Sequence, residues 1–194
     1  MTAVAIIPAR VGSTRIPGKN FRPFHGKPII AYSIETALAT NLFDDVFVST
    51  DNDEAEFIAC RHGASVIRRD EDDGTRGTQD VVAEGLLLLR NFGREYDYDY
   101  CCCIYATAPL MIAEDLHLGY EKLRRENVPY VHSVGPDWMD AGQWYWGRSY
   151  NFIIGTPLDQ AALYMLPAER VCDINTLDDW RQAEAMYAAM KGLA

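Results

Sequence analysis

The sequence lacks the long apolar segments of membrane-spanning and secreted proteins. Its most apolar stretches, GLLLL at 85–89 and YCCCIYATAPLMIA at 100–113, are too short or too polar to span a bilayer. The first residues, MTAVAIIPAR, carry no basic region ahead of their apolar run, so we expect no signal peptide and no membrane partner. A cytoplasmic location is the expectation that follows.

Histidine and cysteine are too few and too unevenly spaced to predict a metal cluster. The four histidines are scattered without H-x-x-x-H spacing, so we expect them to be structural or surface residues. Three of the five cysteines are consecutive, Cys101–Cys103, which predicts reduced thiols in a buried strand. The same interpretation covers Cys60 and Cys172.

Common catalytic and nucleotide-binding motifs are also missing. The chain has no G-x-G-x-x-G fingerprint and no G-x-S-x-G elbow, and Gly18-Lys19 is followed by Asn20 rather than by the Ser or Thr of a P-loop. The formal net charge of -10 argues against a nucleic-acid partner, which needs a basic stripe. It leaves room for a small phosphorylated ligand that meets a few local cations.

What the chain does contain is a regular alternation of short β-rich runs and amphipathic helical segments. Strands are predicted at 3–7, 44–51, 65–69, 98–107, 130–135, 162–167 and 171–175. Helices are predicted at 28–40, 53–63, 78–93, 113–127 and 177–192. The stretch 136–157, rich in Trp and Tyr, is predicted to be irregular.

This alternation predicts one α/β domain over residues 1–194, with a mostly parallel sheet flanked by helices. Ligands on such sheets bind beyond the carboxyl ends of the strands. We therefore expect the loop that follows the first strand, residues 8–27, to lie at the substrate site.

The loop is locally basic although the protein is acidic. Residues 6–20, IIPARVGSTRIPGKN, contain three cations and no acid. Arg10 and Arg15 can grip phosphate oxygens with paired hydrogen bonds, and Lys19 can act as a point charge. This composition predicts an anion-binding loop.

Neutral groups in the same loop suit the rest of a nucleotide. Gly12 lets a ligand approach the backbone closely, and Ser13 adds a neutral donor. The amide of Asn20 can both donate and accept, which suits the edge of a base. Further along, Arg76 is the lone cation of the acidic loop DEDDGTRG.

Two polar residues near the C-terminus suggest a magnesium site. Asp173 follows the apolar pair Val171-Cys172 at the end of a predicted strand, where a carboxylate either binds Mg²⁺ or caps a turn. Asn175, two residues later, is expected to point to the same face of the strand as Asp173, and it offers a neutral oxygen. Thr176, with Asp179 three residues later, predicts a capping box for the last helix.

The segment WMDAGQWYWG at 138–147 has several open interpretations. Its aromatic side chains could pack over the edge of the sheet, and the functional alternatives are a sugar-site wall and a contact between two copies in a homodimer. Asp140 and Gln143 are its polar exceptions, and both suit a sugar hydroxyl.

Six ordered segments covering nearly the whole chain resemble the acylneuraminate cytidylyltransferases, and especially the pseudaminic acid branch. These are IIPARVGSTRIPGKN, GKPIIAYSIETAL, LFDDVFVSTD, IYATAP, DAGQWYWG and DINTLDDW. The resemblance implies a Rossmann-like nucleotide-diphospho-sugar transferase fold. It also implies a reaction of CTP with a nonulosonic acid that gives a CMP-sugar and pyrophosphate, with Mg²⁺ as cofactor.

The resemblance also implies roles for individual residues. The nucleotide-binding positions are Arg10, Gly12, Ser13, Lys19, Asn20, Arg76 and Gln79, and Arg10 and Lys19 are the catalytic cations among them. The positions on the sugar side are Tyr105, Thr107, Asp140 and Gln143. The metal positions are Asp173 and Asn175.

The chain departs from the family pattern at three places. Thr14 replaces a lysine of the loop, Asn175 replaces a second aspartate, and several dozen residues are missing between about 135 and 140. Three hypotheses therefore stand: a nonulosonate cytidylyltransferase, a spore-coat-like cytidylyltransferase acting on another acidic sugar, and a catalytically weak nucleotide-binding homologue.

Overall fold

The computed structural model of the chain describes residues 1–10, 12, 15–70, 76–93 and 97–193. Within these residues, one large sheet has seven strands. In sheet order they are β5 (Ser65–Arg68), β4 (Asp45–Thr50), β1 (Ala3–Pro8), β6 (Tyr100–Ile104), β8 (Asp140–Arg148), β7 (Tyr130–Val134) and β9 (Ala162–Met165). The β5-β4-β1-β6 half is parallel, as predicted, and β8 runs antiparallel between β6 and β7.

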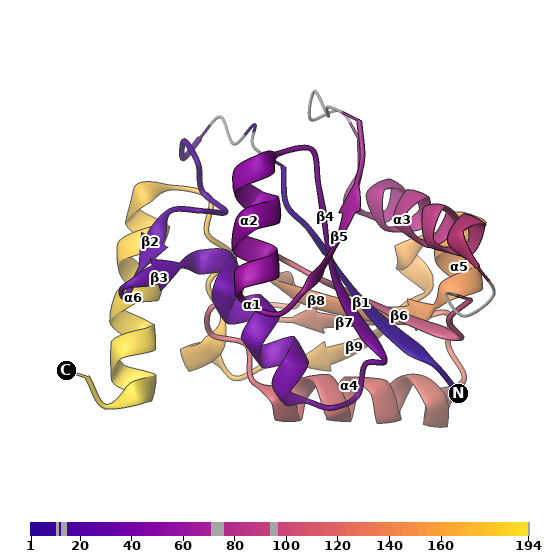
Figure 1. Cartoon of the computed structure of the whole chain (residues 1–194). Helices are drawn as coiled ribbons and strands as arrows, with labels where there is room; N and C mark the ends of the chain where they lie inside the picture. The colour runs from indigo at the N-terminus through magenta and orange to yellow at the C-terminus, as the bar shows by residue number, and fades with distance from the viewer. Residues whose placement is uncertain (11, 13–14, 71–75, 94–96, 194) are drawn as a thin grey trace.

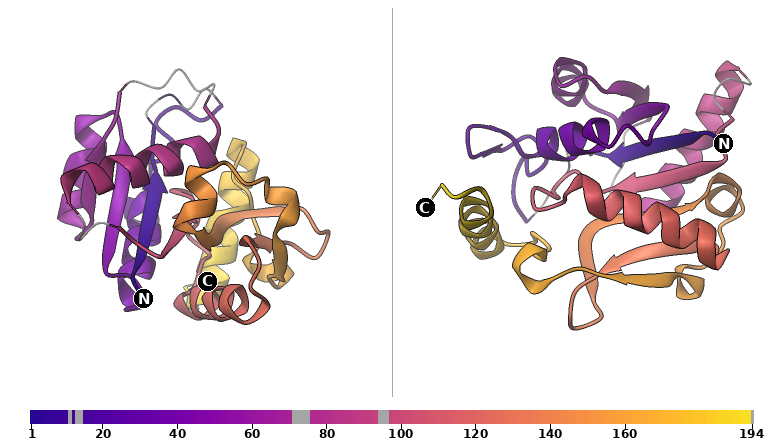
Figure 2. Two further views of the ribbon diagram at one scale, coloured as in Figure 1. Left: turned by 90° about the vertical axis from the view of Figure 1, so that its right-hand side faces the viewer. Right: turned by 90° about the horizontal axis from the view of Figure 1, so that it is seen from below.

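Helices cover both faces of the sheet (Figures 1 and 2). On one face lie α1 (Ile29–Ala39), α2 (Asp53–Arg61) and α4 (Ala113–Glu126), which share a buried apolar cluster with the strands. On the other face lie α3 (Thr78–Phe92) and α5 (Ser149–Ile153), with a second cluster. The apolar periodicity of these segments places their buried stripes on the sheet.

A smaller unit closes the loop end of the domain. The two-stranded hairpin of β2 (Pro23–Phe24) and β3 (Lys27–Pro28) lies beside α6 (Leu177–Lys191) in Figure 1. A third apolar cluster contains Ile16 of the first crossover, Ile174 and Trp180. The capping box of Thr176 and Asp179 starts α6, as predicted. The short 3-10 helix η2 (Leu158–Gln160) lies between α5 and β9 in the chain, and η3 (Ala168–Arg170) lies between β9 and α6.

Two sequence predictions were wrong. The stretch 136–157 is not irregular, because it contains β8 and α5. The segment 171–175 is not a strand but a connection to α6. An interior strand of this sheet is covered on both faces, so residues 141–147 of β8 are all buried and lack the alternation of an exposed strand.

The aromatic segment has a packing role, but on an interior strand rather than over the edge of the sheet. Trp144 and Trp146 are fully buried on the α4 side of β8, and Tyr145 is buried on the opposite side. They form core rather than a sugar-site wall or a contact between copies. Trp138 and Met139, at the start of the segment, are exposed.

Two further expectations concern the cysteines and the membrane. Cys101, Cys102 and Cys103 are buried unpaired thiols of β6, as predicted, whereas Cys60 is exposed and Cys172 half-buried. Burial raises the pKa of Cys103 to about 12. In the part of the chain that the structure describes, every helix is too short or too polar to cross a bilayer.

The packing of α4 on β8 depends on a glycine. A Cβ at Gly119 would lie 2.4 Å from Cη2 of Trp144 and 3.1 Å from Cδ1 of Trp146. We predict that Gly119→Ala lowers the free energy of unfolding by about 1–3 kcal/mol, because two rigid rings must move. Helix propensity alone predicts the opposite sign, a gain of up to about 1 kcal/mol.

Urea unfolding of the two proteins measures this difference. Glu121→Ala, on the exposed side of the same helix, is the control and should change the free energy little. A Gly119→Ala protein that is more stable than the parent would contradict the packing argument.

Candidate functional site

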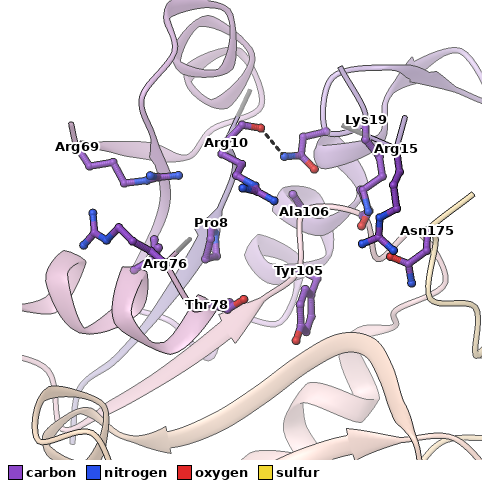
Figure 3. Close-up of a pocket in the computed structure, with 13 residues that line it drawn as sticks. Pro8, Arg10, Arg15, Lys19, Arg69, Arg76, Thr78, Tyr105, Ala106 and Asn175 are labelled. Atoms are coloured by element: carbon purple, nitrogen blue, oxygen red, sulfur yellow. Dashed lines mark hydrogen bonds between the residues drawn. The ribbon is translucent and has the colours of Figure 1, made fainter. Parts of the chain in front are cut away.

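A pocket of about 250 Å³ opens beyond the carboxyl ends of the parallel strands (Figure 3). Pro8 ends β1, Arg69 follows β5, and the residues 105–107 follow β6. The crossover after β1 contributes the opposite wall. In the sheet, β4 and β6 flank β1 on opposite sides, so the strand order reverses at β1. The pocket lies beyond the strand ends at this reversal, where ligands of such sheets bind.

Positive charge dominates the pocket. The side chains that line it include five cations, Arg10, Arg15, Lys19, Arg69 and Arg76. Among the described residues, its lining contains no Asp or Glu. Figure 3 shows Arg69, Arg76 and Arg10 on one side and Arg15 and Lys19 on the other. A small ligand carrying several negative charges fits this arrangement.

Lys19 is held between the first crossover and the C-terminal segment. Its Nζ donates a 2.6 Å hydrogen bond to the carbonyl oxygen of Ile174. Burial lowers the pKa of Lys19, the charge of Asp173 partly offsets this, and the charges of Arg15 and Arg10 lower it further. An anion in the pocket would relieve that repulsion, so the site is electrostatically prepared for one.

The start of α3 adds a second source of positive potential. Thr78, the first residue of α3, lines the pocket, and the unpaired amides of a helix N-terminus attract anions. Arg76 precedes the helix, and its guanidinium lies 2.8 Å from Glu84 Oε2. This ion pair orients the Arg76 side chain along the pocket wall.

Asn20 has a structural contact in addition to its place in the pocket. Its Nδ2 donates to the carbonyl oxygen of Arg10 at 2.9 Å, the dashed line of Figure 3. This bond ties the two ends of the basic loop together. The Oδ1 atom is left to accept a hydrogen bond from a ligand.

The predicted sugar-side residues divide into two groups. Tyr105 and Thr107 line the pocket, and the Tyr105 hydroxyl donates a 3.0 Å hydrogen bond to Asp140 Oδ2. Gln143 does not reach the pocket. It is buried, and its Nε2 donates to the carbonyl oxygen of Arg170.

Two predicted nucleotide-binding residues do not line the pocket, and a third is not among the residues that the structure describes. The Gln79 side chain turns away, and its Nε2 lies 3.4 Å from the carbonyl oxygen of Thr156. Gly12 is exposed and does not line the pocket. Ser13, and Thr14 with it, falls outside the residues that the structure describes.

The two predicted metal positions adjoin one another. Asn175 lines the pocket, and its Nδ2 donates a 2.5 Å hydrogen bond to Asp173 Oδ2. Within the described ranges, no group of three or more His, Cys, Asp or Glu side chains could hold a metal by itself. An oxygen pair of this kind suits Mg²⁺, which takes one or two protein oxygens and completes its shell with water and phosphate.

Arg69 and Thr78 were not identified from the sequence, and Arg15 was named as a cation of the basic loop but is not among the residues that the resemblance implies. Arg69 is 8% exposed and directly follows the last residue of β5. Its position at the carboxyl end of a predicted parallel strand could have identified it as a site residue. For Thr78, the sequence indicated only that a helix begins there.

The comparisons with known proteins agree with one another. The model of a family described as cytidylyltransferase matches residues 4–143. The pseudaminic acid cytidylyltransferase of Campylobacter jejuni subsp. jejuni is 32% identical over 228 aligned positions, which cover 96% of this chain and 97% of that protein. The CMP-N,N'-diacetyllegionaminic acid synthase of Legionella pneumophila is 34% identical over 143 positions, covering 71% of this chain and 62% of that protein.

A solved structure supports the fold. The CMP:2-keto-3-deoxy-manno-octonic acid synthetase complexed with CTP superimposes with a TM-score of 0.79 over 98% of this chain and 100% of that one. The sequence identity is 17%, so this likeness concerns the fold alone. It confirms the predicted Rossmann-like transferase architecture.

The lowered pKa of Lys19 leads to a pH-dependent prediction. The cationic form binds an anion, so affinity is complete below the Lys19 pKa and declines as the pH rises through it. Because that pKa lies below 10.5, the decline begins at a lower pH than for an exposed lysine. The loss is roughly 10- to 100-fold if one charged hydrogen bond is removed.

Calorimetric titration with inorganic pyrophosphate, from neutral pH upward, measures this decline against Lys19→Arg. Arginine stays charged, so the variant should lack the Lys19-dependent decline. Lys191→Arg, at the exposed end of α6, is the control and should keep it. Identical pH profiles for the parent and Lys19→Arg would contradict the assignment.

Proposed function

The chain belongs to the cytidylyltransferase family, and we propose that it transfers CMP from CTP to a nonulosonic acid of the sialic or pseudaminic type, releasing pyrophosphate. The observation that carries this proposal is the pocket with five cations and no acidic lining residue in the described chain. It lies at the strand ends of a chain that aligns over 96% of its length with a pseudaminic acid cytidylyltransferase.

The reaction needs charge neutralisation more than a protein nucleophile. A hydroxyl of the sugar attacks the α-phosphorus, a P–O bond forms, the bond to the pyrophosphate oxygen breaks, and negative charge collects on the leaving group. In the proposal, Arg10 and Lys19 hold the phosphates, with support from Arg15, Arg69 and Arg76. Fixed cations in a partly buried site lower the barrier because they need little reorganisation.

The remaining polar groups are proposed to recognise the two substrates. The free oxygen of Asn20 suits the exocyclic amine of cytosine, since its nitrogen already bonds Arg10. Tyr105, Thr107 and Asp140 are proposed for the sugar side. Gln143 donates to a backbone carbonyl, which supports a role in holding the wall rather than in contacting sugar.

Magnesium is part of the proposal, with Asp173 and Asn175 as its protein ligands. Asn175 lines the pocket and bonds Asp173, which is close enough to Lys19 for its charge to influence the Lys19 pKa. Bound Mg²⁺ would supply further positive charge to the phosphates. Asp173 and Asn175 provide the oxygens, and Lys19 fixes the backbone of the intervening Ile174.

The domain is proposed to be a single, shortened cytidylyltransferase unit. Only residues 135–139 join β7 to β8. The alignment with the C. jejuni protein spans 228 positions, more than the 194 residues here, so that relative carries segments without a counterpart in this chain. A cytoplasmic location is also proposed, and the five unpaired cysteines suit a reducing compartment. A homodimer stays a prediction.

A second candidate rests on Asn175 and the short β7–β8 connection. Both features favour a catalytically weak nucleotide-binding homologue, while a spore-coat-like enzyme would differ in its acidic sugar. Pyrophosphate release measured with CTP, Mg²⁺ and a panel of acidic sugars separates these functions. We expect release with pseudaminic or N-acetylneuraminic acid. Release with another acidic sugar alone, or CTP binding without turnover, would contradict the primary proposal.

The metal ligands generate a separate prediction. Asn175→Asp adds a second carboxylate beside Asp173, and Mg²⁺ affinity rises with the charge of its oxygen ligands. The Mg²⁺ concentration that gives half-maximal pyrophosphate release should therefore fall several-fold. Gln182→Glu, exposed on α6, adds the same charge away from the pocket and serves as the control. An unchanged Mg²⁺ dependence in Asn175→Asp would show that residue 175 is not a ligand.

A further inference from the structure

Three polar side chains form a row from the pocket wall into the antiparallel half of the sheet. Tyr105 lines the pocket just beyond β6, and its hydroxyl donates to Asp140 Oδ2 at 3.0 Å. The other carboxylate oxygen, Oδ1, lies 3.1 Å from His132 Nε2 on β7. The row thus joins the end of β6, the start of β8 and the middle of β7 through one carboxylate.

An irregularity in β8 creates this arrangement. The register between β7 and β8 shifts between His132 and Val134, and Gly142 adopts a left-handed φ of +65°. Its amide donates to Asp140 Oδ1 at 2.7 Å. A Cβ at Gly142 would lie 2.9 Å from Asp173 Oδ1, so only glycine fits this turn without strain. Bulges commonly re-aim a side chain in this way.

The hydrogen bonds fix which atom Tyr105 can offer to a ligand. Burial raises the pKa of Asp140, but His132, the Gly142 amide and the Tyr105 hydroxyl outweigh it and hold that pKa below its usual value. Asp140 is therefore an acceptor at neutral pH. Burial and the charge of Asp140 raise the pKa of Tyr105 well above its usual range. The Tyr105 proton thus stays on the hydroxyl and points to Asp140, which leaves the oxygen lone pairs as acceptors.

His132 is the inner end of the row. Its side chain is 17% exposed, its ring meets that of Tyr145 edge-on at 5.8 Å, and Nε2 is shielded from solvent. The contact with Asp140 is within hydrogen-bond distance, although it is less well aligned than a regular hydrogen bond. Asp140 itself is 41% exposed and would be freer to turn toward water without His132.

We propose that His132 is a positioning residue for the acceptor sugar: through Asp140 it orients Tyr105 so that the phenol oxygen accepts a hydrogen bond from a sugar hydroxyl or acylamino N–H. This inference rests on the proposed function and identifies which atom recognises the second substrate. His132 touches neither substrate. Its removal should weaken sugar binding and leave CTP binding unchanged, because the Tyr105 ring points away from Arg10 (Figure 3) and His132 does not line the pocket.

The test combines His132→Leu, His132→Gln, Tyr105→Phe and the double variant His132→Leu/Tyr105→Phe. Calorimetry measures the Kd of pseudaminic acid with an unreactive α,β-methylene CTP analogue bound, and separately the Kd of that analogue. We expect His132→Leu and Tyr105→Phe each to weaken sugar binding about five- to tenfold, the effect of one lost hydrogen bond. The double variant should bind no worse than Tyr105→Phe alone, because both changes remove one coupled unit.

His132→Gln keeps an N–H donor near the position of Nε2 and should restore most of the affinity. His62→Leu is the matched control, since His62 pairs with Glu35 at 3.0 Å outside the pocket. Multiplicative losses in the double variant, an equal loss of analogue affinity, or unaltered sugar affinity in His132→Leu would overturn the inference. Failure of the proposed function appears instead in the parent protein, as absent pyrophosphate release with CTP, Mg²⁺ and the panel of acidic sugars.

Discussion

The concentration of like charge in one pocket is the constraint on which the site depends. Five cations line a space of about 250 Å³ in a protein with a net charge of -10, and the described lining itself contains no Asp or Glu. Their repulsion, together with burial, appears in the lowered pKa of Lys19. The packed sheet holds these side chains together, and a polyphosphate ligand replaces repulsion with attraction.

The loop after β1 keeps its cations in place because it contacts the C-terminal segment of the chain. Lys19 donates to the carbonyl of Ile174, and Ile16 belongs to the same buried cluster as Ile174 and Trp180 of α6. Asp179, at the start of α6, accepts from the amide of Asn175. The phosphate side and the proposed metal side of the pocket are therefore held together by direct contacts, although 155 positions separate Lys19 from Ile174.

The two halves of the sheet serve different parts of the proposed reaction. The parallel half ends in cations, whereas the antiparallel half brings the carboxylate of Asp140 to Tyr105. A sugar acid with a carboxylate and several donors suits a site that offers both cations and hydrogen-bond acceptors. The buried Trp144 and Trp146 fix β8 against α4, and β8 carries Asp140 at its first residue. Core packing thereby sets the position of a recognition group.

The sequence by itself determined the α/β class, the parallel strands, the helices, the family and the basic loop, because these depend on local periodicity and short-range composition. It also indicated Arg10, Lys19, Asn20 and Asn175 as neighbours of a ligand, and all four line the pocket. Only the tertiary structure decided that β8 is an interior strand, that Arg69 joins the cations, and that Gln143 turns to a backbone carbonyl. Those outcomes depend on pairing between residues far apart in the chain. The side-chain pattern of one segment does not indicate which other segment it will pair with.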